Sequence, residues 1–106
     1  MSTRQIETIV KKYANTLKKN KISFNNVYLF GSYALGKAKP YSDIDVAVVV
    51  DKIKSNRDYM ERKMKLWELT PEVDVRIEPA LIEKTDIEQG NTAIANEVKR
   101  YGVLIA

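Results

Sequence analysis

The sequence of 106 residues contains neither cysteine nor histidine, and these two absences exclude several kinds of chemistry. Without cysteine there can be no disulfide framework, no thiol nucleophile and no cysteine-ligated zinc site. Without histidine there is no Ser-His-Asp triad, no imidazole acid–base catalysis and no histidine-ligated metal. Any catalysis must use carboxylates, lysine, arginine or hydroxyl groups. The metals that suit such a chain are hard, oxygen-ligated ions such as Mg²⁺.

Long apolar runs are also lacking, because no stretch reaches the length of a membrane span and the N-terminal segment has no signal-peptide core. We therefore expect a cytoplasmic protein that does not bind membranes. With 44% hydrophobic and 30% charged residues, the composition indicates a single globular domain over residues 1–106. The net charge of +4 suits a phosphate-bearing ligand or an acidic partner. The lysines of the first helix are interpreted as a solvated face, not as a nucleic-acid site.

Hydrophobic periodicity predicts helices over residues 3–19, 55–69 and 92–101, and strands over 27–30, 44–50, 72–78 and 103–106. The order is helix, strand, strand, helix, strand, helix, short strand. It favours an α/β or α+β fold with one mixed sheet and helices on one side. Core-facing residues are expected at these positions: Met60, Met64, Trp67, Val73, Val75, Ile77, Ile94, Val98 and Tyr101. A ligand pocket is the alternative for the Met and Trp stripe.

Asp43 and Asp45 stand at the beginning of an apolar strand, where charged side chains are unexpected. Residues two apart on a strand point to the same face, about 6.5 Å from each other, so the two carboxylates converge. Like charges at the edge of a core repel each other and resist desolvation, and a bound divalent cation removes both problems. The pair is therefore predicted to hold Mg²⁺, in a two-metal site that clamps a phosphoryl displacement.

A third carboxylate would complete such a site, and Asp74 is the candidate in the predicted strand 72–78. If that strand neighbours the acid-bearing strand, Asp74 comes close to the carboxylate pair. It could then bridge a metal ion or accept the proton of an attacking hydroxyl. Taken alone, Asp74 is equally well explained as an ordinary solvated strand residue.

Gly31 and Ser32 end the preceding strand and could bind an anion. Glycine allows the backbone to approach a ligand closely, and we expect a short helix to begin here, whose N–H groups would cradle phosphate. A simple Gly-Ser turn is the alternative. Either Lys37 or Lys39 could reach a triphosphate, but surface solvation explains both lysines equally well.

The segment from Gly31 to Val46 reads G-S-x-A-x-G-x(5)-S-D-I-D-V. This pattern resembles the signature of nucleotidyltransferases related to DNA polymerase β, with Asp74 standing where that family carries its third acid. In its small size the chain resembles members of the minimal nucleotidyltransferase (MNT) subfamily. The motifs span residues 31–74, and the predicted order of elements extends the resemblance to nearly the whole chain.

The resemblance implies a mixed sheet with helices packed on one face and a reaction that moves a nucleoside monophosphate from an NTP to an acceptor hydroxyl, releasing pyrophosphate. It also implies roles for individual residues. Asp43, Asp45 and Asp74 would be catalytic and would bind Mg²⁺, with Asp74 as third ligand and possible base. The residues implied in nucleotide binding are Gly31, Ser32, Lys37 and Ser42, of which the first two would hold the β- and γ-phosphates.

The resemblance further implies a partner, because many minimal members are similar to antitoxins encoded beside a toxin of the HEPN ribonuclease type. The implied activity is transfer of AMP from ATP to a tyrosine of that toxin, within a homo- or hetero-oligomer. Two alternatives stay open: an antitoxin that blocks its toxin by contact alone, and an aminoglycoside-type small-molecule nucleotidyltransferase subunit. One departure is Leu35, where members often carry Arg; Lys37 could substitute for it.

Overall fold

The computed structural model describes residues 2–106 and forms nine elements along the chain. In order these are α1 (Thr3–Lys19), β1 (Asn26–Phe30), β2 (Ile44–Val50), α2 (Asn56–Glu68), the 3₁₀ helix η1 (Thr70–Glu72), β3 (Ile77–Glu83), α3 (Lys84–Gln89), α4 (Ala93–Tyr101) and β4 (Val103–Leu104). The predicted first helix, second strand and last helix are confirmed. The short helix α3 was not predicted.

The four strands form one mixed sheet in the order β3-β2-β1-β4. β1 pairs antiparallel with β2 and with β4, whereas β2 and β3 run parallel, joined by the crossover through α2. The register places Asp45 of β2 directly opposite Glu78 of β3. Because directly opposite residues share a face of the sheet, these two carboxylates lie side by side.

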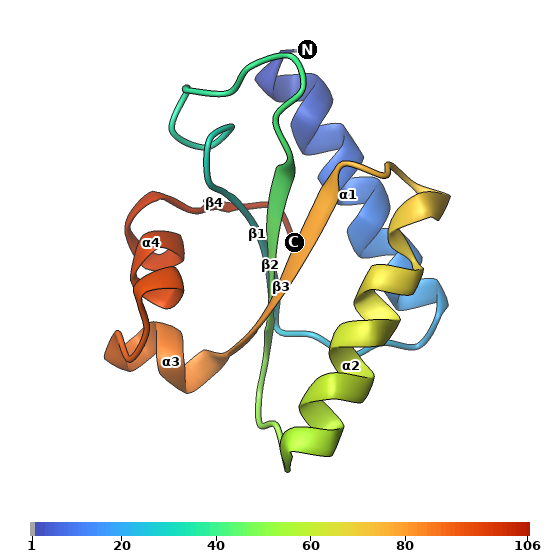
Figure 1. Ribbon diagram of the computed structural model, residues 1–106, viewed down its shortest axis with the longest axis vertical. Helices are drawn as coiled ribbons and strands as arrows, with labels where there is room; N and C mark the ends of the chain where they lie inside the picture. The colour runs from blue at the N-terminus through green and yellow to red at the C-terminus, as the bar shows by residue number, and fades with distance from the viewer. Residues whose placement is uncertain (1) are drawn as a thin grey trace.

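The α/β fold class is confirmed, but the helices divide between the two faces of the sheet. α1 and α2 cover one face, and α3 and α4 lie on the other (Figure 1). The prediction of helices on one side is therefore incomplete. The reason lies in β1 and β2: their residues are apolar on both faces, so both faces need a cover.

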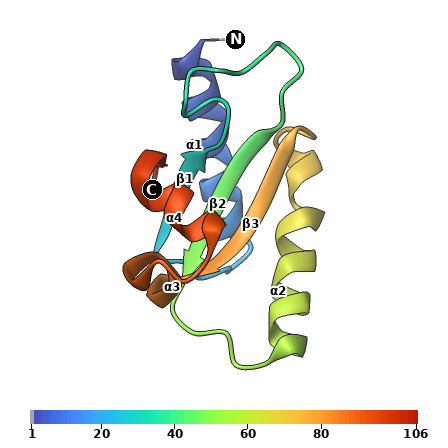
Figure 2. The same ribbon diagram turned by 60° about the vertical axis from the view of Figure 1, so that its left-hand side comes forward.

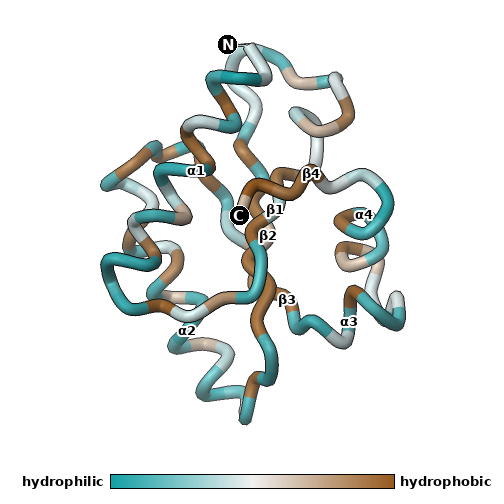
Figure 3. The backbone as a smooth tube through the Cα atoms, turned by 180° about the vertical axis from the view of Figure 1, so that it is seen from behind, coloured by the Kyte–Doolittle hydropathy of each residue, from teal (hydrophilic) through white to brown (hydrophobic). Residues whose placement is uncertain are grey.

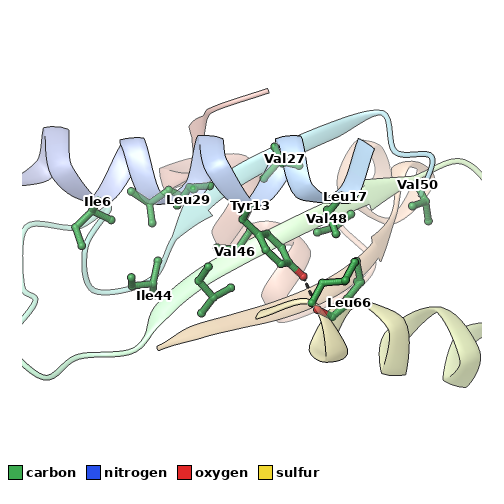
Figure 4. Packing of buried hydrophobic residues seen from close by; sticks show 14 residues of the cluster. Ile6, Tyr13, Leu17, Val27, Leu29, Ile44, Val46, Val48, Val50 and Leu66 are labelled. Carbon is green, nitrogen blue, oxygen red and sulfur yellow. Dashed lines mark hydrogen bonds between the residues drawn. The ribbon is translucent and has the colours of Figure 1, made fainter. Parts of the chain in front are cut away.

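The larger core lies beneath α1 and α2, where alternate residues of β1 and β2 meet the apolar stripe of α1 (Figure 4). Tyr13 is completely buried there, and its hydroxyl donates a 2.7 Å hydrogen bond to the carbonyl of Leu66 in α2. Burial raises the pKa of this tyrosine well above its usual value. A buried hydroxyl needs such a partner, so this bond fixes α2 against α1.

The residues that begin the helices follow the expected capping chemistry. Ser2 and Gln5 form a capping box at the start of α1, and lysines at its last turn suit the helix dipole. At the start of α2 only one of the two hydrogen bonds of a capping box forms. The Ser55 hydroxyl accepts from the N–H of Asp58, whereas the Asp58 carboxylate accepts from Lys54.

The predicted buried stripe of α2 is wrong. Met60 and Met64 are 51% and 58% exposed, Trp67 is 40% exposed, and the helix buries Leu66 instead. The helix lies beside the edge strand β3 and not over the middle of the sheet (Figure 2), so only one narrow arc of it is covered.

α4 departs from its predicted stripe in the same way. Val98 is buried as expected, but Ile94 and Tyr101 are 41% and 51% exposed, and Ala95 takes the second core position. Gly102 caps the helix, with its N–H donating to the Val98 carbonyl. It does so in an extended conformation.

The third strand is displaced from its predicted place. Residues 72–78 were expected to alternate as a strand, but β3 begins at Ile77 and continues through Pro79 to Glu83. Pro71 lies in the first turn of the 3₁₀ helix η1, and the chain then turns with the Asp74 carboxylate accepting from the Arg76 N–H. Residues 72–76 therefore form a turn, although their polar and apolar side chains alternate as in a strand.

Hydropathy along the backbone follows this layering (Figure 3): the strands are the apolar centre, and the helices are largely hydrophilic on their outer surfaces. Within residues 2–106, no helix has both the length and the apolar character required to cross a membrane.

Candidate functional site

A cleft of about 850 Å³ opens on the face of the sheet that carries α4 and continues around the edge of β3 towards α2. Its walls come from the end of β1 and the turn after it, from β2, β3, α2 and α4. The lining residues are Phe30, Gly31, Ser32, Leu35, Lys37, Asp45, Tyr59, Lys63, Trp67, Glu78, Pro79, Ala80, Leu81, Ile82, Ala93, Ile94 and Glu97. The beginnings of β2 and β3, which carry Asp45 and Glu78, therefore lie in one concave surface.

Acidic side chains gather at one end of this cleft. Asp45 and Glu78 face it from neighbouring strands, and Asp43 lies close to both without lining the cleft. Burial, followed by the charges of Asp43 and Glu97, raises the pKa of Asp45. The hydrogen bond with Asp43, together with burial and the charge of Asp45, raises the pKa of Glu78. Repulsion among these carboxylates favours any ligand that brings positive charge to them.

The turn after β1 brings the backbone against this acidic cluster. Gly31 has φ of +72°, and a Cβ atom built on it would lie 2.1 Å from a carboxylate oxygen of Asp45. The expected short helix does not form; instead the chain makes successive turns, with the N–H of Leu35 on the Gly31 carbonyl and that of Lys37 on the Ser32 carbonyl. The absence of a side chain at Gly31 leaves Asp45 uncovered towards the cleft.

We expect Gly31→Ala to lower catalytic activity at least tenfold, because the new methyl group must displace the Asp45 carboxylate. The positive φ adds a backbone penalty of about 1 kcal/mol. The matched control is Gly36→Ala, which has a similar φ of +71° but no atom within 4 Å of its Cβ. Equal losses of activity in the two variants would show that backbone strain alone is responsible.

The structure does not bring Asp74 to the other acids. It lies in the turn before β3, where its carboxylate pairs with the Arg76 guanidinium at 2.8 Å. Hydrogen bonding from Arg76 lowers the pKa of Asp74. Asp74 does not line the cleft, and the position it was expected to occupy beside Asp45 is filled by Glu78.

The predicted nucleotide-binding residues separate into two groups. Gly31, Ser32 and Lys37 line the cleft, and so does Leu35, at the position where relatives of the motif often carry Arg. Ser42 does not line it. Its hydroxyl accepts a 2.8 Å hydrogen bond from the N–H of Lys39, so it fastens the loop that leads into β2.

The residues of the cleft fit Mg²⁺ as an ion shared with a ligand. In the part of the chain that the structure describes, no three acidic side chains are arranged so that they could hold a metal ion by themselves. However, Mg²⁺ usually takes only one or two carboxylates and completes its shell with water and substrate phosphate oxygens. Asp45 in the cleft and Asp43, two residues before it, are carboxylates of the kind that such a donor set requires.

Sequence reasoning missed Glu78, Glu97 and the α2 side of the cleft. Glu78 lay within the predicted strand 72–78, but Asp74 was chosen there as the third acid, and the strand was ended before Pro79 although proline is accepted in edge strands. A signal was present in the apolar residues 80–82 that follow it. Trp67 was recognised as a pocket candidate only in the alternative interpretation, and the structure places it in the cleft wall.

Comparison with known proteins identifies the family. The protein-family model that describes the nucleotidyltransferase domain matches residues 9–105, nearly the whole chain. The chain belongs to this nucleotidyltransferase family. It is 32% identical over 97 residues to "Putative protein adenylyltransferase MJ0141" of Methanocaldococcus jannaschii, with 88% of each chain covered. As a nucleotidyltransferase, the protein is an enzyme of nucleotidyl transfer.

Solved structures show the same fold. A "putative nucleotidyltransferase from Sulfolobus solfataricus" superposes with a TM-score of 0.66 at 18% identity, over 96% of this chain and 80% of that one. A toxin-antitoxin structure with AMP-PNP superposes with a TM-score of 0.60 at 25% identity, over 94% of this chain and 72% of that one. A complex of the tri-AMPylated Shewanella oneidensis HEPN toxin with an MNT antitoxin gives a TM-score of 0.55 at 23% identity, over 98% of this chain and 71% of that one. The fold of this nucleotidyltransferase is thus similar to that of an MNT antitoxin solved in complex with a HEPN toxin.

Proposed function

We propose that this nucleotidyltransferase moves AMP from ATP to a tyrosine hydroxyl of a HEPN-type toxin and thereby acts as its antitoxin. The observation that carries the proposal is the meeting of Asp45 and Glu78 beside the Gly31–Ser32 turn in one cleft, with Asp43 next to this pair. The relative named as a protein adenylyltransferase and the neighbour bound to AMP-PNP support ATP as the donor. The AMPylated HEPN toxin in another neighbour supports the acceptor.

The residues of the turn would hold the donor phosphates. Backbone N–H groups after Gly31, together with the Ser32 hydroxyl, can donate to phosphate oxygens, and Lys37 supplies positive charge from the same wall. Leu35 brings no charge, so Lys37 is the cation of this loop that lines the cleft. Its amine would take the place of the arginine that many members of the family carry.

Asp43 and Asp45 would hold Mg²⁺ together with the donor phosphates. When bound, Mg²⁺ neutralises charge on the phosphates and on the two carboxylates. Glu78 lies opposite Asp45 and would accept the proton of the acceptor hydroxyl. In the reaction the acceptor oxygen forms a bond to the α-phosphorus, the bond from that phosphorus to the β-phosphate oxygen breaks, and pyrophosphate leaves. The second ion of the predicted two-metal site stays a prediction.

The proposal is tested with the co-purified toxin partner, Mg²⁺ and ATP labelled at the α-phosphate. We expect the label on a tyrosine of the partner and an intact mass that rises by one or more AMP groups, with no incorporation in EDTA. ATP labelled at the γ-phosphate is the control, because it distinguishes AMP transfer from phosphorylation. Incorporation of γ-label, or an unmodified partner after full incubation, would contradict the proposal.

The same experiment separates the two alternatives. A contact-only antitoxin would inhibit the ribonuclease without changing the mass of the partner. A small-molecule transferase would label an added aminoglycoside and leave the partner unlabelled. The family membership favours catalysis over contact alone, and so does the presence of Asp45, Glu78 and the glycine turn in one cleft.

A further inference from the structure

One carboxylate of the cleft has no part in the chemistry proposed above. Asp43 and Asp45 are assigned to Mg²⁺ and Glu78 to the proton of the acceptor, whereas Glu97 lines the same cleft from α4. Glu97 is half-buried, and among the described residues its carboxylate has no hydrogen bond or ion pair. A charge that is partly removed from water favours a ligand of opposite charge.

The helix α4 holds Glu97 on a fixed wall. Ala95 and Val98 are buried against the sheet, so the helix cannot rotate without exposing them. Ala93 and Ile94 line the cleft beside Glu97. They precede it by four and three residues, the spacings at which side chains are neighbours on a helix surface. The α4 wall is therefore apolar with a single negative charge.

The other walls of the cleft carry its positive charges. Lys37 lies on the turn after β1, and Lys63 lies on α2, 5.8 Å from the centre of the Tyr59 ring. A triphosphate carries several negative charges, so the walls with lysine attract it and the wall with Glu97 repels it. The donor is thus favoured on the lysine side, and the α4 side is left for the acceptor.

Glu97 also lies close to the place of transfer. Burial, followed by the charges of Asp43 and Glu97, raises the pKa of Asp45. The interaction between two charges falls with distance and with screening by salt, so Glu97 must lie close to Asp45 to have this effect. A positive group that is bound to Glu97 would therefore be near the reacting hydroxyl.

We propose that Glu97 determines acceptor specificity, by selecting an acceptor hydroxyl that has a positively charged group beside it. This inference rests on the proposed function and specifies its acceptor: a tyrosine with a lysine or arginine next to it. The cation would pair with Glu97 on the α4 wall, while the hydroxyl approaches Glu78. Charge complementarity of this kind supplies specificity more than affinity.

The first test measures transfer of α-labelled AMP to the co-purified toxin partner. We expect Glu97→Gln to lower kcat/KM for the partner about tenfold, because the charge pair is lost. Glu97→Lys should lower it by about a hundredfold or more, because two like charges then meet. The KM for ATP should not rise in either variant, because Glu97 lies away from the lysine walls.

Glu88 provides the matched control. It lies on α3, is exposed, and does not line the cleft. Glu88→Gln and Glu88→Lys change the net charge of the protein by the same amounts, and both should keep transfer near the wild-type rate. Equal losses in Glu97→Lys and Glu88→Lys would overturn the proposal.

Charge reversal on both sides separates specificity from a general effect on the site. Each lysine or arginine that flanks the labelled tyrosine of the partner is changed to glutamate. One such change should lower transfer by the wild-type enzyme about tenfold and raise transfer by Glu97→Lys by a similar factor. An effect of Glu97 through Asp45 or Mg²⁺ would lower transfer to every acceptor alike. Failure of every reversal to restore transfer, or a tyrosine without a basic neighbour, would overturn the proposal.

An aminoglycoside presents the same chemistry, because its hydroxyls lie beside ammonium groups, so kanamycin is the second acceptor in the test. If the wild-type enzyme labels kanamycin and not the partner, tyrosine transfer fails. Selection of a cation by Glu97 then stands provided that Glu97→Lys loses this labelling and Glu88→Lys keeps it. If the partner gains AMP equally well from the wild type and from Glu97→Lys, the proposed function stands and the role of Glu97 fails.

Discussion

Replacing Asp45 with asparagine should reduce nucleotidyl transfer to below about one-thousandth of the wild-type rate, a loss of about 4 kcal/mol in transition-state stabilisation. The substitution keeps the shape of the side chain and removes one of the two charges that we assign to Mg²⁺. It also leaves Gly31 itself unchanged beside the substituted side chain. Transfer to the toxin partner, followed by α-label incorporation, is the measurement. Asp43→Asn is expected to act in the same direction.

The matched control is Asp51→Asn, at the far end of the same strand. Asp51 is exposed and accepts a hydrogen bond from Asn25, outside the cleft. It should retain nearly full transfer activity. If Asp45→Asn and Asp51→Asn were equally active, the assignment of the carboxylate pair to catalysis would be wrong.

The same variant should gain stability when metal is removed with EDTA. Burial and neighbouring acids raise the pKa of Asp45, so its charged form is disfavoured in the folded state. A carboxyl group with a raised folded-state pKa stabilises the fold below its unfolded pKa, and this contribution is lost as the pH rises through the folded value. At neutral pH we therefore expect Asp45→Asn to have the higher Tm, a difference that narrows towards acidic pH.

Glu78→Gln should lower kcat by about a hundredfold or more, the usual contribution of a positioned acid or base. Asp74→Asn should change kcat much less, because Asp74 is paired with Arg76 in the turn and does not line the cleft. The measurement is kcat for transfer under saturating ATP and partner. This comparison decides between the acid that the sequence pattern suggested and the one that the structure places beside Asp45.

Asp74→Asn should instead show its effect in unfolding experiments. Losing the charged hydrogen bonds to Arg76 should cost about 1–3 kcal/mol of unfolding free energy at neutral pH. The Arg76 hydrogen bonds lower the pKa of Asp74, so this stability is present above the ordinary pKa of an aspartate. It is lost as the pH falls through the lowered value. A large loss of kcat in Asp74→Asn with normal stability would reverse the assignment.

Much of this protein was predictable from local sequence. The spacing of apolar residues in α1, the apolar run of β2 and the capping residues Ser55 and Thr92 are short-range signals, and each element formed where it was expected. The Gly31–Ser32 turn and the Asp43/Asp45 pair also depend on neighbours within a few residues. Their combination was sufficient to indicate the family, and the family model confirms it.

The placement of the third acid could not be predicted in this way. Alternation over residues 72–78 has the period of a strand, yet the parallel pairing with β2 begins at Ile77 and continues through Pro79. Which residue of a segment enters a sheet depends on its neighbouring strand, and a shift of a few residues changes every facing side chain. That shift replaced Asp74 by Glu78.

What the sequence by itself determined is therefore the set of local elements, the glycine turn, the aspartate pair and the kind of reaction. Only the tertiary structure decided that Glu78 stands opposite Asp45, that α4 covers the second face of the sheet, and that Trp67 lines a cleft. The physical reason is the range of the forces that are involved. Helix periodicity and turn chemistry act over a few residues, whereas strand register and the burial of a helix arc depend on segments that are distant in the chain.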